Sequence, residues 1–286
     1  MGKPLISVLV PCYNRERYIE EALLSILEQD YPHFELIVVD DGSQDSSVEK
    51  IERLRQRYGF QFYRQANQGV SAALNTALAH ARGEFIATSD SDDVMLPGRL
   101  SLQAEYLQSH PEVGCLGGKV VYVDADGQRI KAESASGVRS YSFAELLATA
   151  HAVGGPVAMY RREAMEKAGG YDAAIRIQDF QMTLKIANLG YRIDVLPDLV
   201  ALYRRHPENM SKKAYKQQLA YDLMAIAPYR EHQAYSAGRV CVINKALKQS
   251  VVCEKIYAVS LFLKMLPWRW NRVTWRRLRH LLFRFS

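Results

Sequence analysis

The chain has 286 residues, room for one large domain or one domain with an appendage, and a core of that size needs no disulfide or metal to hold it. Hydrophobic residues make up 48% and charged residues 24% of the chain, which excludes a disordered or fibrous protein. Four cysteines without a CxxC spacing argue against a zinc ribbon or disulfide scaffold and fit reduced thiols in the cytoplasm.

The net charge of +6 is unevenly distributed along the chain. Residues 255–286 contain eight Lys and Arg and no Asp or Glu. The rest of the chain then carries 29 basic and 31 acidic residues, a net charge of −2. We therefore expect only the tail to bind anions, and we do not expect nucleic acid as a partner. The apolar run near the N-terminus is too short for a secretory signal, and no stretch reaches the ~20 apolar residues of a membrane span.

The first half of the sequence alternates strand and helix patterns. A continuous apolar run predicts a strand buried on both faces over residues 5–10, and further strands are predicted over 34–39, 60–64 and 84–88. Apolar residues at helical spacing predict three helices between these strands, with Asn14 capping the first and Asp45 capping the second. This order predicts an α/β fold, with a mostly parallel central sheet and helices on both faces.

Strict alternation ends after the fourth strand. The patterns there are strands over 113–123, 157–160, 193–196 and 199–203, and helices from about 143, over 162–168 and over 178–189. From about residue 211 onward the pattern is helical only.

Polar loops follow the predicted parallel strands at their carboxyl ends, where open α/β sheets bind ligands. Asp90, Asp92 and Asp93 crowd three carboxylates into four residues, and these cannot all ionise cheaply without a cation. Carboxylates without competing nitrogen or sulfur ligands suit Mg²⁺ or Mn²⁺, which bridge to substrate phosphates. The cluster therefore predicts a divalent metal site, with a solvated acidic turn as the alternative.

Two other loops at this edge carry residues suited to a nucleobase. A carboxylate of Asp40 or Asp41 can accept a hydrogen bond from an imide N–H, although capping of the next helix is the alternative. Tyr13 offers a flat ring for base stacking, or else packs at the rim.

Together these motifs resemble the family 2 glycosyltransferases of the GT-A fold, in order over roughly the first 211 residues. The segments that carry the resemblance are SVLVPCYN (7–14), FELIVVDDGSQD (34–45), NQGVSAALN (67–75), GEFIATSDSDD (83–93), GGYD (169–172), QDFQMTLKIANLGY (178–191) and YRRHPENMS (203–211). The resemblance implies a GT-A catalytic domain over residues 1–210, followed by a helical extension over 211–286.

The resemblance also implies roles for individual residues. Asp179 matches the catalytic base, and Gln178 replaces the Glu that usually precedes it, which puts in doubt an acceptor contact that needs a charge there. Asp41, rather than Asp40, matches the residue that binds the imide. The expected nucleotide-binding residues are Pro11, Tyr13, Asn14, Asp41, Asn67 and Asp92, and the expected metal site is Asp92, Asp93 and His206, with Asp90 at the start of the motif.

The implied reaction is inverting transfer of a sugar from a nucleotide-diphosphate sugar to a hydroxyl of a glycan or lipid-linked acceptor, in envelope polysaccharide or lipopolysaccharide synthesis. UDP is the expected nucleotide, although a thymidine nucleotide offers the same imide edge. Mn²⁺ or Mg²⁺ would stabilise the leaving diphosphate, and Asp179 would take the proton of the acceptor hydroxyl. No covalent nucleophile is needed, and we expect Cys12 to be a buried packing residue.

Three other classes of protein fit the sequence less well. A sugar-nucleotide nucleotidyltransferase would need a glycine-rich phosphate loop after the first strand, where this sequence has Pro11-Cys12-Tyr13-Asn14. A signalling receiver domain leaves the second acidic cluster and the large second half unexplained. A catalytically inactive relative is the third alternative, and intact Asp92, Asp93 and Asp179 count against it.

The C-terminal tail reads WRWNRVTWRRLRHLLFRFS after Pro267. One helical face carries Trp275, Leu278, Leu281, Leu282 and Phe285, and a neighbouring face carries Arg272, Arg276 and Arg279. An amphipathic helix with Trp and Arg suits the interface of an anionic membrane, whereas a helix packed on the catalytic domain is the alternative. We expect a cytoplasmic protein that binds the inner face of the cell membrane peripherally through residues 255–286.

Overall fold

A computed structural model describes residues 2–207, 215–265 and 270–283. The chain divides into two compact units. The larger unit combines Met1–Ser142 with Ala152–His206, and the smaller unit combines Phe143–His151 with Pro207–Ser286. The domain boundary expected at residues 210 and 211 lies outside the described residues, as do Pro267, Trp268, Phe285 and the end of the 203–211 motif, so these expectations stay predictions.

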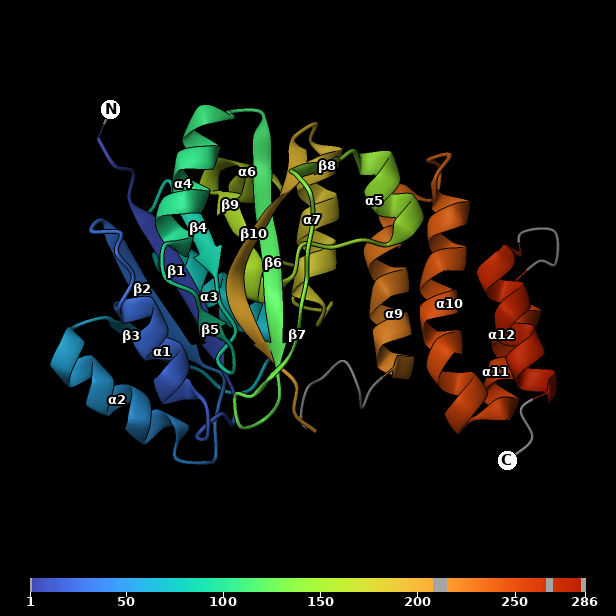
Figure 1. Cartoon of the computed structure of the whole chain (residues 1–286), viewed down its shortest axis with the longest axis horizontal. Coiled ribbons are helices and arrows are strands. Elements are labelled where there is room, and N and C mark those ends of the chain that lie inside the picture. The colour runs from blue at the N-terminus through green and yellow to red at the C-terminus, as the bar shows by residue number, and fades with distance from the viewer. Residues whose placement is uncertain (1, 208–214, 266–269, 284–286) are drawn as a thin grey trace. The chain divides into compact units, whose positions relative to one another are not determined.

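The larger unit is built on a ten-stranded sheet with the order β3-β2-β1-β4-β9-β6-β10-β5, while β7 pairs with β6 and β8 with β10 (Figure 1). The strands are β1 (Ile6–Cys12), β2 (Phe34–Asp40), β3 (Gln61–Arg64), β4 (Phe85–Thr88), β5 (Val94–Met95), β6 (Val113–Val123), β7 (Arg129–Ala132), β8 (Arg139–Tyr141), β9 (Met159–Arg161) and β10 (Arg192–Arg204). Strands β3, β2, β1 and β4 pair in parallel, as do β6 and β10, and β9 runs antiparallel between β4 and β6. This mostly parallel, mixed sheet confirms the expected fold class.

Helices cover both faces of this sheet. They are α1 (Ile19–Leu27), α2 (Ser47–Tyr58), α3 (Val70–His80), α4 (Arg99–Ser109), α6 (Arg162–Lys167) and α7 (Gln178–Asn188). Apolar residues of α1, α2 and α4 share one core cluster with Ile6, Val8 and Val10 of β1. Helix α3 contacts β1 and β2 but contributes no residue to that cluster, because it lies on the opposite face (Figure 1).

The structure corrects two local expectations. The two strands expected over 193–196 and 199–203 are one strand, β10, whose register against β6 shifts between Val195 and Leu199. Pro197 lies in this interval and has no N–H for the ladder, yet the chain stays extended through it. Asn14 does not cap the first helix: it adopts a left-handed conformation with φ of 51°, and α1 begins only at Ile19.

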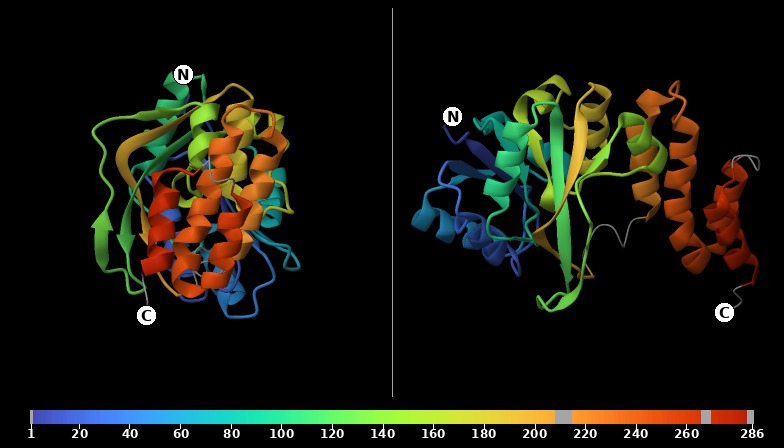
Figure 2. Two further views of the ribbon diagram at one scale, coloured as in Figure 1. Left: turned by 90° about the vertical axis from the view of Figure 1, so that its right-hand side faces the viewer. Right: turned by 45° about the horizontal axis from the view of Figure 1, so that its top comes forward.

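The smaller unit is a group of helices around α10 (Tyr235–Cys253). Its other helices are α5 (Phe143–Thr149), α9 (Tyr215–Ile226), α11 (Lys255–Lys264) and α12 (Arg272–Phe283), and each of them contacts α10 (Figure 2). In sequence, α5 lies between two strands of the larger sheet. Among the described residues, no helix combines the length and the apolar character needed to cross a membrane.

Helix α12 packs on α10 through part of its surface. Thr274 is buried and accepts a hydrogen bond of 2.9 Å from Asn244 of α10. Leu278 and Leu281 are half-buried, whereas Trp275 and Leu282 are exposed. The apolar face expected for this helix is thus divided between packing and solvent.

Candidate active site

The acidic loop directly follows β4 and gathers three carboxylates. Asp90, Asp92 and Asp93 each offer one oxygen, and these oxygens lie within 4.8 Å of one another. Oδ2 of Asp93 is buried and has no hydrogen-bond partner in the described part of the chain. A buried carboxylate oxygen without a partner is costly, and a cation would remove that cost. These residues therefore fit the divalent cation that their sequence predicts.

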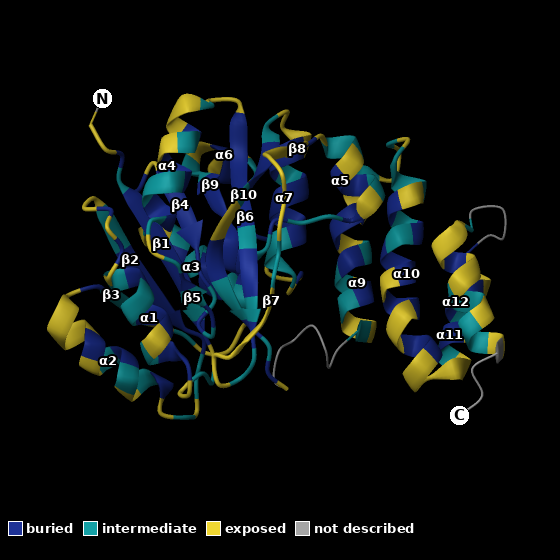
Figure 3. Cartoon of the chain, viewed as in Figure 1, coloured by how far each residue is buried: buried dark blue, intermediate teal, exposed yellow. Residues whose placement is uncertain are grey.

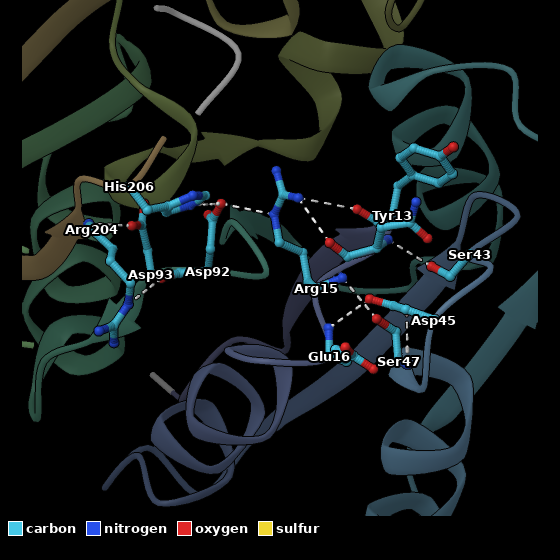
Figure 4. Close-up of polar contacts among 11 residues, drawn as sticks. Tyr13, Arg15, Glu16, Ser43, Asp45, Ser47, Asp92, Asp93, Arg204 and His206 are labelled. Carbon is cyan, nitrogen blue, oxygen red and sulfur yellow. Dashed lines mark hydrogen bonds and ion pairs between the residues drawn. The ribbon is translucent and has the colours of Figure 1, made fainter. Parts of the chain in front are cut away.

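Asp92 already has two cationic or hydrogen-bonding neighbours (Figure 4). Its Oδ2 accepts a hydrogen bond from Nε of Arg15 at 2.9 Å and contacts Nε2 of His206 at 3.0 Å. Arg15 also donates from Nη1 to the carbonyl oxygens of Tyr13 and Asn14. Desolvation works to raise the pKa of Asp92, but the His206 hydrogen bond and the Arg15 charge hold that pKa below its ordinary value.

The other two carboxyl groups are shifted in the opposite direction. Burial raises the pKa of Asp90 well above its ordinary value, and the charges of Asp179 and Asp92 raise it further. Burial, followed by the charges of Asp90 and Asp92, likewise raises the pKa of Asp93, although its Oδ1 accepts a hydrogen bond of 2.7 Å from the Arg204 backbone. The pKa of Asp92 is thus lowered while those of Asp90 and Asp93 are raised, and a divalent cation bound beside them would favour ionisation of all three carboxyl groups.

Asp179 lies at the start of α7 and faces the acidic loop across a glycine. A Cβ placed on Gly155 would lie 2.9 Å from Oδ1 of Asp90 and 3.3 Å from Oδ1 of Asp179, so both carboxyl groups approach the same bare backbone. Desolvation raises the pKa of Asp179 to about 7, against a smaller opposing effect of a hydrogen bond from the Gly155 backbone. A carboxyl group with a pKa near neutrality is suited to general-base work at physiological pH.

The carboxylate of Asp41 organises a neighbouring loop. Its Oδ1 accepts hydrogen bonds from the Gln65 side chain at 2.8 Å and the Gln68 backbone at 2.9 Å, and its Oδ2 accepts one from the Gly69 backbone at 2.7 Å. This role in folding the loop was not expected from the sequence. The contact expected between Asp41 and a nucleobase imide stays a prediction, because it would need a remaining lone pair of the same carboxylate.

Three further nucleotide-binding candidates belong to the same group of loops. Asn14 joins the first two loops, since its N–H donates to Oγ of Ser43 and its Oδ1 accepts from the Gln44 backbone. Tyr13 is 42% exposed, and Asn67 is exposed in the loop held by Asp41. The structure thus leaves a flat aromatic surface open at this edge of the sheet (Figure 4).

The remaining candidates are less accessible or lie beside Asp179. Pro11 is part of β1 and partly exposed, and Gln178 is the first residue of α7 and also partly exposed. Asp40 is fully buried and accepts a hydrogen bond of 3.1 Å from the Ser43 backbone, which is a role in loop structure. Burial, with a further contribution from the Asp40 charge, raises the pKa of the Cys12 thiol to about 12, so this thiol is not a nucleophile at neutral pH.

Sequence reasoning missed two arginines of the site. Arg15 follows the Pro-Cys-Tyr-Asn segment directly, and the need of three crowded acids for a nearby cation was a signal that could have identified it. Arg99 is fully buried in α4 and donates to the carbonyl oxygens of Thr88, Pro156 and Ala158. It therefore ties the start of the acidic loop to the segment around Gly155, and no local pattern in the sequence indicated this.

The fold is that of the GT-A glycosyltransferases. A family model described as Glycosyl transferase family 2 matches residues 7–169, more than half of the chain, and the chain belongs to this family. Among named relatives, it is 27% identical over 249 residues to an uncharacterised glycosyltransferase of Methanocaldococcus jannaschii, with 84% of each chain covered. It is 28% identical over 214 residues to the amylovoran biosynthesis glycosyltransferase AmsE of Erwinia amylovora, covering 73% of this chain and 79% of AmsE. Two other relatives are matched over only 53% and 42% of their own length.

Solved structures confirm the fold. The S. aureus TarS fragment 1-349 in complex with UDP-GlcNAc aligns with a TM-score of 0.67 at 24% identity, covering 96% of this chain and 81% of TarS. The mannosyltransferase PcManGT of Pyrobaculum calidifontis in complex with GDP-Man and Mn²⁺ aligns with a TM-score of 0.64 at 22% identity, covering 99% and 86%. At these identities the likeness establishes the shared architecture.

Proposed function

We propose that this protein is a metal-dependent, inverting glycosyltransferase that uses a nucleotide-diphosphate sugar, most simply a UDP-sugar. The observation that carries the proposal is the approach of Asp90 and Asp179 to the same glycine, with the carboxylates of Asp92 and Asp93 beside them. The UDP-GlcNAc bound to TarS and the GDP-Man and Mn²⁺ bound to PcManGT support a sugar-nucleotide donor and a divalent cation.

The proposed division of labour follows from the chemistry of each group. Asp92 and Asp93 would hold the cation, and His206 contacts Oδ2 of Asp92 at this site. The bound cation would act as a Lewis acid toward the leaving diphosphate. Asp179, when ionised, accepts the proton of the acceptor hydroxyl. As that proton leaves, the acceptor oxygen bonds to the anomeric carbon and the bond from that carbon to the diphosphate oxygen breaks. One displacement from the face opposite the leaving group inverts the configuration.

The loops at the carboxyl ends of β1, β2 and β3 would bind the nucleoside. The exposed ring of Tyr13 would stack on the base, and Asp41 would accept the imide N–H. Asn14, Asn67 and Pro11 border the same loops. Because Asp41 also holds the backbone of Gln68 and Gly69, its loss would disturb the loop as well as the base contact.

We place the acceptor among envelope glycans or lipid-linked glycans, and the enzyme at the cytoplasmic face of an anionic membrane. The name of AmsE, an amylovoran biosynthesis glycosyltransferase, supports a polysaccharide acceptor. Exposed Arg272, Arg276 and Arg279 on α12 support peripheral attraction to anionic headgroups. Replacing these three arginines by Gln is the test of that attraction, because removing the whole helix would also uncover the buried contact between Asn244 and Thr274.

The metal role is tested by calorimetric titration of UDP in the presence of Mn²⁺ or EDTA. We expect binding to need Mn²⁺ and to weaken at least about tenfold in Asp92→Asn, since one charged ligand contributes about 1.4 kcal/mol or more. Asp126→Asn is the matched control, because that carboxylate is exposed and forms an ion pair with the exposed Arg17. Equal UDP affinity in EDTA and Mn²⁺ would refute the metal role.

The reaction is tested by turnover of UDP-sugars with NMR of the anomeric centre of the product. Inversion supports the single displacement, and retention contradicts it. Formation of a UDP-sugar and pyrophosphate from UTP and a sugar phosphate would instead identify a nucleotidyltransferase. Donor binding without turnover of any kind would identify an inactive relative.

A further inference from the structure

Among the described residues of the smaller unit, the two most exposed apolar residues lie on α11 rather than on α12. Ile256 is 89% exposed, Leu263 is 81% exposed and Val259 between them is 46% exposed. Their spacing of three and four residues places them on one face of the helix. The opposite face packs into the unit through Ala258, Leu261 and Phe262. A contiguous apolar face in solvent marks an interaction surface. Figure 3 colours each residue of the chain by its burial, with exposed residues in yellow.

We propose that this face of α11 inserts into the boundary between headgroups and acyl chains of an anionic lipid bilayer. The inference rests on the membrane association proposed above and names the part of the chain that enters the bilayer. Helix α11 has ten residues, so it would lie in the plane of the interface rather than cross the membrane.

The charges around this face favour an anionic surface as its partner. Lys255 and Lys264 are exposed at the two ends of α11, and residues 255–286 contain no Asp or Glu. The nearest acid before the helix, Glu254, is already bound by Lys216 at 2.6 Å and by the Tyr215 hydroxyl at 3.0 Å. A second copy of the same face would bring cations against cations, which opposes self-association through it.

Aromatic contacts connect the packed face of α11 to the basic helix α12. The ring of Trp270 lies 5.5 Å from that of Phe262 in α11 and 4.9 Å from that of Trp275 in α12. Trp275 is 57% exposed, and tryptophan favours the membrane interface because its ring is apolar and its N–H is polar. Cations on α12 and apolar side chains on α11 would then supply the two signals that stable membrane anchoring needs.

The test is the double variant Ile256→Ser/Leu263→Ser in the full chain, because serine removes apolar surface without changing the charge. Partition is measured with vesicles of equal parts phosphatidylglycerol and phosphatidylethanolamine, at low and at high salt. High salt screens the cations, so the apolar contribution dominates there. We expect the wild-type protein to retain binding at high salt, and the variant to bind at least about tenfold more weakly, since burying one large apolar side chain contributes about that factor.

Two controls separate this inference from the proposed function. Met224→Ser changes another exposed apolar side chain of the smaller unit, on α9, and should leave partition unchanged. The Arg272→Gln/Arg276→Gln/Arg279→Gln variant should lose binding mainly at low salt. If the arginine variant loses binding while the serine variant binds like wild type at both salts, the membrane association stands and the role of α11 is wrong.

Two other outcomes would also overturn the proposal. If the wild-type protein does not bind the vesicles at either salt concentration, both the proposed membrane association and the proposed insertion of α11 are refuted. A wild-type dimer in vesicle-free sedimentation that the serine variant converts to monomer would show that a second copy covers α11. Unchanged melting temperatures of all variants ensure that these results report binding rather than unfolding.

Discussion

Replacing Asp179 by Asn is expected to stabilise the protein while it removes most of its activity. Desolvation raises the pKa of this carboxyl group from an ordinary value of 3.8 to about 7. At about 1.36 kcal/mol per pKa unit, this shift of roughly three units corresponds to about 4 kcal/mol, an upper limit on what it costs the fold. Below pH 3.8 the carboxyl group is protonated in both the folded and the unfolded chain, and it does not lower the free energy of unfolding. As the pH rises toward 7, the unfolded chain releases its proton first, and the free energy of unfolding falls.

Asn has no such titration, so its advantage over Asp179 should grow between about pH 4 and pH 7. The Asn amide is still a polar group in the desolvated position, and we therefore expect a stabilisation of about half of the 4 kcal/mol limit. A gain of about 2 kcal/mol would raise the Tm by roughly 4–8 °C. Calorimetry of the ligand-free protein in EDTA at pH 5, 6, 7 and 8 measures this difference, with Asp126→Asn as the exposed control.

The activity of the same variant should move in the opposite direction. Loss of the general base should lower turnover by roughly 10²–10⁴-fold, with UDP binding unchanged. Wild-type turnover should rise with pH through about 7, as Asp179 loses its proton. A difference in Tm that is the same at pH 5 and pH 8 would refute the desolvation argument, and near wild-type turnover would move the base to another residue.

Three further substitutions test other parts of the structure. Arg15→Gln should tighten Mn²⁺ binding about fivefold without nucleotide, because a charge that competes for Asp92 is worth about 1 kcal/mol in a partly solvated site. Titration by electron paramagnetic resonance measures the Mn²⁺ affinity, and weaker binding would contradict the prediction. Gly155→Ala should reduce turnover by about 10²-fold with little change in Tm, because its Cβ displaces the Asp90 carboxylate. Kinetics measures the turnover and calorimetry the Tm, and full activity would contradict the prediction. Gly238→Ala should destabilise the protein by about 1–3 kcal/mol without weakening UDP binding, because its Cβ would overlap a backbone carbonyl oxygen of α5. Urea unfolding measures this loss, and an unchanged midpoint would show that α5 and α10 separate easily.

The sequence predicted β1, β2 and β4, which are apolar runs largely buried within the sheet, and also β3, which lies at the sheet edge with half-buried or exposed residues. Strands β5, β7 and β8 have two to four residues and were not predicted, and β7 (RIKA) and β8 (RSY) also carry no continuous apolar run. Strand β10 was predicted as two strands because Pro197 interrupts its apolar pattern, while the pairing with β6 on either side of the proline holds it as one. Pairing across the sheet thus decided what local pattern could not.

The acidic cluster of the site was predictable because its crowding is visible within four residues. Asp179 was identified only through the family resemblance, since a single acid at a helix start has no distinctive pattern. The contact between Arg15 and Asp92 joins residues 77 positions apart, and Gly155 approaches Asp90 from another distant loop. Such contacts depend on which strand ends meet at the sheet edge, and no local spacing encodes them.

Helix α5 also has a consequence for how the chain is synthesised. Leu146 and Leu147 are fully buried in the smaller unit, whose remaining helices are encoded after residue 207. When the ribosome has released the first 206 residues, every strand of the described sheet has emerged, but α5 still has no helices to cover its leucines. At roughly 5–20 residues per second, the last 80 residues take roughly 4–16 seconds more. During that interval, α5 is an apolar segment on a nascent chain, which is the kind of segment that a chaperone at the ribosome binds.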